Sequence, residues 1–130
     1  MWKLFLIIFL AIESTNTIAE WMVVEKNNSE GMTRYVDIST IKKINNKTRM
    51  VDLIDYQVSR VAIDDKFLSI KIVQEYDCNE TRKRILAFNT YIRNMGKGEV
   101  VYRDTSPNEW KIIPSFGHTG MKLWKIACNI

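Results

Sequence analysis

The sequence predicts an α+β domain, in which an antiparallel sheet of about six strands is covered by one C-terminal helix and held by one disulfide. Two observations lead to this fold class. Apolar and polar residues alternate with a period of two, most clearly over residues 67–77, which is typical of a half-buried strand. Near the C-terminus the spacing becomes helical, with Met121, Trp124 and Cys128 on one side.

Residues 1–19 have the features of a secretory signal peptide. A start containing Lys3 is followed by an apolar run over residues 4–12 and a polar stretch that leads to Ala19, after which we expect cleavage. The apolar run has nine residues, whereas a membrane-spanning helix needs roughly twenty. Cleavage therefore leaves no transmembrane anchor, and we expect residues 20–130 as one exported domain.

Composition and charge exclude several classes of protein. The chain has 130 residues, enough for one domain, and 46% of them are hydrophobic, which excludes a disordered or low-complexity protein. The formal net charge is +4, with acidic and basic residues mixed along the chain. Such a balance permits an acidic partner but does not indicate binding to nucleic acid.

The N-terminal half is predicted to contain three strands and one helical turn. Residues 21–25 form an apolar run, and a turn signal separates them from a second strand over residues 32–38. Asp37 could accept hydrogen bonds from the free amides of a single helical turn over residues 38–41, which would interrupt the sheet. A third strand is expected over residues 48–56.

The C-terminal half is predicted to contain three more strands and the helix. Residues 67–77 and 82–93 should form an antiparallel pair, and residues 99–103 a short strand. We expect Thr119 to cap the helix, which would carry Cys128 on its packed face. Apolar surroundings also predict that three tryptophans lie in the core: Trp21, Trp110 and Trp124.

The two cysteines, Cys78 and Cys128, are predicted to form a structural disulfide. An exported chain meets an oxidising compartment, and a small domain gains from such a bond. Closing a loop of about fifty residues stabilises a fold by roughly 4 kcal/mol. The alternative is a reactive or metal-binding thiol pair. That alternative needs further ligands, and His118 is the only histidine, so we expect no metal and no cofactor.

No pattern of catalytic residues is present, and we expect no enzyme activity. The sequence has neither a glycine-rich phosphate loop nor a Gly-x-Ser-x-Gly motif. Asp52 with Asp55, or Asp64 with Asp65, could act as an acid and a base. We interpret these carboxylates as exposed strand and turn residues, and His118 as a loop or capping residue.

Five basic residues form the candidate site for a protein partner: Arg82, Lys83, Arg84, Arg93 and Lys97. A strand and its turn would present them to an acidic surface. The alternative is a charged sheet edge that only keeps the protein soluble, and such an edge would also allow two copies to pair as a homodimer. A regular strand would place Arg82 and Arg84 on the face of Leu86 and Phe88, with Lys83 on the other face.

Several segments carry short motifs in a fixed order. They are YVDISTIKK (residues 35–43), VDLIDY (51–56), EYDCNETRKRILAFNTY (75–91), MGKGEVV (95–101), EWKIIPSF (109–116) and LWKIAC (123–128). In this order and spacing the mature chain resembles the bacterial surface-adhesin protein E family.

This resemblance implies an exported, disulfide-bonded α+β domain in the periplasm or at the cell surface of a Gram-negative bacterium, with the family cysteines at Cys78 and Cys128. It also implies an adhesin that binds host extracellular-matrix or serum proteins. The alternative function is a soluble periplasmic accessory protein, or an inhibitor that docks on an envelope protein.

Overall fold

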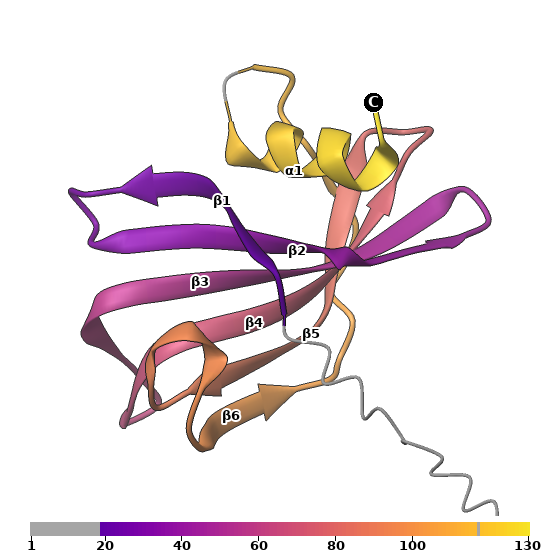
Figure 1. The fold of residues 1–130 in the computed structure, drawn as a ribbon. Coiled ribbons are helices and arrows are strands. Elements are labelled where there is room, and N and C mark those ends of the chain that lie inside the picture. Colours follow the sequence, from indigo (N-terminus) through magenta and orange to yellow (C-terminus); the bar gives the residue numbers. More distant parts are fainter. Residues whose placement is uncertain (1–18, 117) are drawn as a thin grey trace, which may run out of the picture.

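The computed structural model describes residues 19–116 and 118–130, so the predicted signal peptide, apart from Ala19, lies outside the described residues. One antiparallel sheet and a C-terminal helix make up the fold (Figure 1), which confirms the predicted class. The elements are β1 (Trp21–Asn27), β2 (Met32–Ile44), β3 (Lys47–Ala62), β4 (Asp65–Asp77), β5 (Arg82–Tyr91), the 3-10 turn η1 (Asn94–Gly96), β6 (Val100–Asp104), β7 (Lys111–Ile112) and α1 (Thr119–Cys128).

The sheet is a meander in which each strand pairs with its neighbour in the chain, in the order β1 to β6. The short strand β7 was not predicted, and it pairs with the first two residues of β5. The start of β5 is therefore not a free sheet edge, which corrects the prediction made for Arg82, Lys83 and Arg84. The pairing of two copies through an edge strand stays a prediction.

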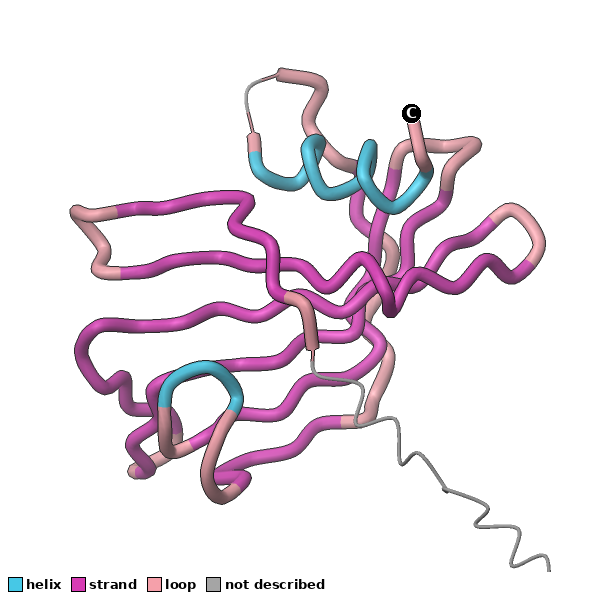
Figure 2. The backbone as a smooth tube through the Cα atoms, viewed as in Figure 1, coloured by secondary structure: helices cyan, strands magenta, loops and turns pink. Residues whose placement is uncertain are grey.

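The core lies between α1 and one face of the sheet, which we call the helix face. Figure 2 shows α1 lying over the strands, with η1 at the far end of the sheet. On the helix, Leu123 and Ala127 are spaced by one turn and buried together with Cys128, as the helical spacing predicts. They pack in one cluster with Val24, Val36, Met50, Tyr76 and Ile113.

The helix begins at Thr119, but Thr119 is not its cap. The capping position belongs to His118, whose side chain makes no capping hydrogen bond. Its carbonyl oxygen instead accepts hydrogen bonds from the backbone amides of Met121 and Lys122. The expected role of Thr119 is therefore wrong by one residue.

The helical turn expected over residues 38–41 is absent, because that segment remains part of β2. Asp37 does accept hydrogen bonds from the amide and hydroxyl groups of Ser39, at 3.0 and 2.5 Å. The side chain of Thr40 then replaces a backbone acceptor between β2 and β3, since its hydroxyl accepts a hydrogen bond of 2.9 Å from the amide of Val51. The result is a shift of register between Asp37 and Lys42 rather than a helix.

A second irregularity determines which way the basic residues of β5 point. Ile85 pairs with Gln74 but Ala87 pairs with Val73, so Leu86 is an extra residue in β5. This bulge interrupts the alternation of faces. Arg82 and Arg84 consequently lie on the face away from α1, while Phe88 lies on the helix face. A regular strand, as assumed from the sequence, would have put them together.

Asp52 is buried, with 1% of the residue exposed, so its interpretation as an exposed carboxylate is wrong. Its direct pairing with Val36, a core residue, shows that Asp52 lies on the helix face. Asp55 lies on the other face, where its carboxylate accepts a hydrogen bond of 2.8 Å from the amide of Met95. The two carboxylates therefore do not form a pair.

Candidate protein-binding surface

Four basic side chains and one tryptophan on the face away from α1 form a surface that we call the arginine–tryptophan patch: Lys47, Arg49, Arg82, Arg84 and Trp110. The guanidinium carbons of Arg82 and Arg84 lie 4.8 and 4.7 Å from the centre of the Trp110 ring, and the Lys47 ammonium lies 5.7 Å from it. Cations at these distances are attracted to the face of an aromatic ring. Two strands, β3 and β5, and the segment before β7 thus contribute to one surface.

Two buried carboxylates on β4 hold the arginines in place. Glu75 accepts hydrogen bonds from Arg49 at 3.0 Å and, through its other oxygen, from two nitrogens of Arg84 at 3.0 and 2.9 Å. Asp77 accepts one of 3.0 Å from Arg82. Both carboxylates are nearly inaccessible, whereas the three arginine side chains are 30–45% exposed. The guanidinium groups are therefore fixed on one side and open to solvent on the other.

The same contacts shift the acidity of both carboxylates. Burial alone would raise the pKa of Glu75, but hydrogen bonds from Arg49 and Arg84, together with their charges, hold it below its ordinary value. Burial also opposes ionisation of Asp77. Its pKa is nevertheless lowered by hydrogen bonds from the amides of Asn79 and Glu80 and from Arg82. Both groups therefore stabilise the fold in their charged forms.

We expect the variant Glu75→Gln to lose less stability on acidification than the unmodified protein. A carboxyl group whose pKa is lower in the folded chain stabilises the fold fully above its unfolded pKa, and this contribution disappears as the pH falls through the folded pKa. For Glu75 the decline begins near its ordinary value of 4.5. Melting temperatures measured between about pH 7 and pH 3 should fall less steeply for Glu75→Gln.

The exposed Glu99 provides a matched control, since it makes no ion pair within the described chain. The variant Glu99→Gln should follow the unmodified protein at every pH. Parallel curves for all three proteins would show that the buried ion pairs of Glu75 contribute nothing that depends on pH.

The structure does not bring all five predicted basic residues together. Lys83 lies on the face opposite Arg82 and Arg84, as predicted from the period of the strand. This is the helix face, which Lys83 shares with Phe88, contrary to the prediction. Arg93 and Lys97 flank η1 beyond the other end of β5, which is about 30 Å along the strand at 3.3 Å per residue. Only Arg82 and Arg84 belong to the arginine–tryptophan patch.

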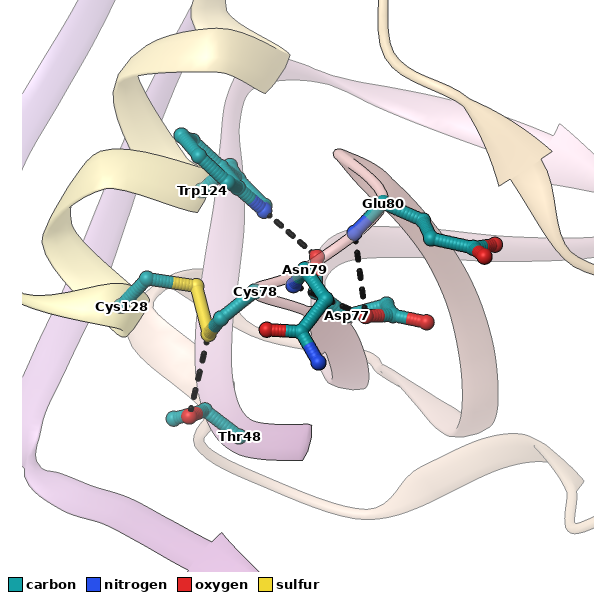
Figure 3. Close-up of a disulfide and its surroundings, with 7 residues drawn as sticks. All are labelled: Thr48, Asp77, Cys78, Asn79, Glu80, Trp124 and Cys128. Atoms are coloured by element: carbon teal, nitrogen blue, oxygen red, sulfur yellow. Dashed lines mark hydrogen bonds between the residues drawn. A yellow bond between two sulfur atoms is a disulfide. The ribbon is translucent and has the colours of Figure 1, made fainter. Parts of the chain in front are cut away.

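The disulfide between Cys78 and Cys128 is present, as predicted, and joins the end of β4 to α1. Figure 3 shows Trp124 of α1 beside this bond, with its indole nitrogen donating a hydrogen bond of 2.8 Å to the carbonyl oxygen of Asp77. The hydroxyl of Thr48 lies 3.6 Å from the sulfur of Cys78. The helix thus fixes the strand end from which Asp77 holds the patch.

The described part of the chain contains neither a cluster of metal ligands nor a helix that could cross a membrane. Within residues 19–116 and 118–130, no three His, Cys, Asp or Glu side chains are grouped so that they could hold a metal ion. Among the same residues, no helix combines the length and the apolar character that crossing a membrane requires. The arrangement can instead present guanidinium and indole groups to a protein surface.

A sequence model of the family described as surface-adhesin protein E matches residues 21–129. The chain belongs to this family. The match covers every strand and helix described above, and it confirms the resemblance inferred from the ordered motifs. No curated protein sequence matches the chain.

Solved structures of protein E from Haemophilus influenzae are similar to this family member. One has a TM-score of 0.67 at 12% identity, and the alignment covers 88% of each chain. Protein E from non-typeable Haemophilus influenzae has a TM-score of 0.62 at 12% identity, with 88% of this chain and 80% of that chain covered. At this identity the likeness shows a shared fold.

Three residues of the patch in this protein E family member were not predicted from the sequence: Lys47, Arg49 and Trp110. Trp110 is half-buried and outside the core cluster, so its assignment to the core is wrong, as is that of Trp21. Trp124, in contrast, packs against the core. No sequence signal identifies Arg49, because its place opposite Glu75, which in turn is opposite Arg84, depends on the register of three strands.

Proposed function

We propose that this protein is an exported, non-enzymatic binding protein that attaches to host extracellular-matrix or serum proteins through the arginine–tryptophan patch. The patch carries this proposal, because it places two partly exposed arginines, Arg82 and Arg84, against the partly exposed Trp110. A third partly exposed arginine, Arg49, shares Glu75 with Arg84. Membership of a family described as surface adhesins supports the same function.

Arginine and tryptophan are the side chains most enriched among residues that dominate the energy of protein interfaces. Binding also costs less entropy when such side chains are already held in one geometry. Here Glu75 and Asp77 hold the three arginines before any partner arrives. The patch has four cationic groups against these two carboxylates, so it suits a partner segment that presents acidic side chains.

Export is part of the proposal. A signal peptide over residues 1–19 would direct the chain out of the cytoplasm. The disulfide agrees with this route, because such bonds persist in oxidising compartments and are rare in the cytosol.

An affinity experiment with two parallel arms tests the proposal. Immobilised residues 20–130, with the disulfide formed, are exposed to a host serum and matrix extract and, separately, to a bacterial envelope extract. We expect retention of a host protein, and we expect this retention to be lost when Trp110→Ala replaces the unmodified chain. Trp21→Ala serves as the matched control, since Trp21 is half-buried but lies outside the patch.

The opposite result has an equally clear meaning. Retention of an envelope protein, with nothing retained from the host extract, would overturn the adhesin function and favour the periplasmic accessory or inhibitor protein. Equal retention of a host protein by Trp110→Ala and by the unmodified chain would remove the patch from the binding site.

A further inference from the structure

A cavity of about 200 Å³ opens on the helix face, beside the start of β5. Its polar lining comes from β2, β4, β5 and β7 and from the segment that leads into β7: Arg34, Gln74, Lys83, Arg84, Asn108, Glu109 and Lys111. The segment is fixed across this region, because the amide of Asn108 donates a hydrogen bond of 2.8 Å to the carbonyl oxygen of Ile85. The cavity is therefore bounded by ordered backbone.

Four of the lining residues are cationic: Arg34, Lys83, Arg84 and Lys111. Arg84 forms an ion pair with Glu75. Lys83 of β5 lies directly opposite Lys111 of β7 in the ladder. Like charges in directly opposed positions of a sheet destabilise it. Neither lysine forms an ion pair within the described residues. Glu109, which is exposed, is the one acidic residue of the lining.

The buried carboxylate beneath the cavity already has partners. Asp52 accepts a hydrogen bond of 2.5 Å from Arg34 and two from the amide of Gln74, at 3.1 and 3.2 Å. Arg34 nevertheless keeps a buried Nε that finds no hydrogen-bond partner among the described residues. The carboxylate of Asp52 is therefore occupied by Arg34 and Gln74, and it forms no ion pair with Lys83 or Lys111.

The pKa of Lys83 agrees with an excess of positive charge at the cavity. Burial lowers its pKa below the ordinary value, and the charges of Arg34 and Lys111 lower it further, while Asp52 acts in the opposite direction. An anion placed between the lysines would relieve both the burial of the ammonium group and the repulsion between like charges.

We propose that this cavity binds a small molecule through a phosphate or carboxylate group, with Lys83 and Lys111 as its charged contacts and Arg34 beside them. The volume supports a small ligand, since 200 Å³ corresponds to about seven water molecules at roughly 30 Å³ each. Inorganic phosphate or a short dicarboxylate fits such a space, whereas a folded partner does not. Arg84 of the patch also lines this cavity, whereas Lys83 and Lys111 lie on the helix face, away from the patch.

Thermal unfolding and calorimetric titration of the disulfide-bonded residues 20–130 test this proposal. Inorganic phosphate and succinate are titrated separately at constant ionic strength, with glucose as a neutral reference. We expect the melting temperature to rise saturably with at least one of the two anions, because a ligand that binds only the folded chain stabilises it. The anion with the tighter binding identifies the preferred group.

Two variants locate the site. Lys83→Met and Lys111→Met should each weaken anion binding by about tenfold or more, since a hydrogen bond to a charged group contributes about 1.5–3 kcal/mol. Without ligand, both variants should melt at or above the temperature of the unmodified protein, because the repulsion is gone. Lys26→Met, at an exposed position of β1, should bind like the unmodified protein.

The proposal has clear contrary outcomes. The absence of a saturable response of the unmodified protein to both anions would overturn it. So would equal anion binding by Lys83→Met, Lys111→Met and the unmodified chain, since the anion would then bind elsewhere. Because the two lysines lie on different strands, a folding defect in one variant leaves the other as the test.

Discussion

Replacing Cys128 with Ser will lower the melting temperature of the oxidised protein by about 15 °C or more. The disulfide closes a loop with a sequence separation of 50 residues, and such a bond stabilises a fold by about 4 kcal/mol in the chain-entropy description. In a domain of about 100 residues, each 1 kcal/mol shifts the midpoint by about 4 °C or more. Differential scanning calorimetry under non-reducing conditions measures this shift.

The reduced form of the unmodified protein provides the control. It should melt close to the Cys128→Ser variant, and a reductant should leave the variant itself unchanged. A nearly unchanged midpoint in the variant would mean that other contacts hold α1 in place. Those contacts are the buried Leu123 and Ala127 and the hydrogen bond from Trp124 to the carbonyl of Asp77.

Substituting Arg82 and Arg84 with Gln will weaken binding to the captured host protein by about a thousandfold, because two interface hot spots together contribute about 4 kcal/mol. The association rate should fall most at low salt, because exposed charges act through screened, long-range attraction. The double variant should therefore also show a flatter salt dependence. Biosensor kinetics over a salt titration measure both effects.

Lys83→Gln is the matched control for this experiment, since Lys83 lies between the two arginines in sequence but on the helix face. Its binding to the host protein should equal that of the unmodified chain. Binding that falls only with Lys83→Gln, or that is unchanged in the double variant, would move the partner site to the helix face. Circular dichroism confirms in each case that the variant is folded.

The spacing of apolar residues along the chain was sufficient to predict the regular strand β4 and the helix α1. The alternation over residues 67–77 predicted the strand observed as β4, and the helical spacing of Met121, Trp124 and Cys128 predicted α1. The disulfide followed from chain length, cysteine count and export. Each of these predictions depends on residues close in sequence, or on a choice among few alternatives.

The features that could not be predicted depend on the pairing of distant strands. The extra residue Leu86 reverses the faces of β5, and nothing in the local sequence of β5 distinguishes it from a regular strand. Asp37 shows the same limit, because its side chain can support either a helical turn or an irregular strand. Only the hydrogen bond from Val51 to Thr40 decides between them.

The candidate site shows this dependence most clearly. The alignment of Arg49, Glu75 and Arg84 requires the register of three strands, and Trp110 reaches them only because β7 pairs with β5. From the sequence, Arg82 and Arg84 could be identified as a basic cluster. The sequence could not show that buried carboxylates hold these arginines in place.

Labelling of intact bacteria tests most directly whether this protein is an exported surface-binding protein. A membrane-impermeant amine reagent is applied to living cells, and the protein is then recovered and examined for modified lysines. Our account predicts labelling on intact cells, together with no labelling of a known periplasmic protein in the same sample. Labelling that appears only after osmotic shock, with the protein released by that treatment, would contradict it.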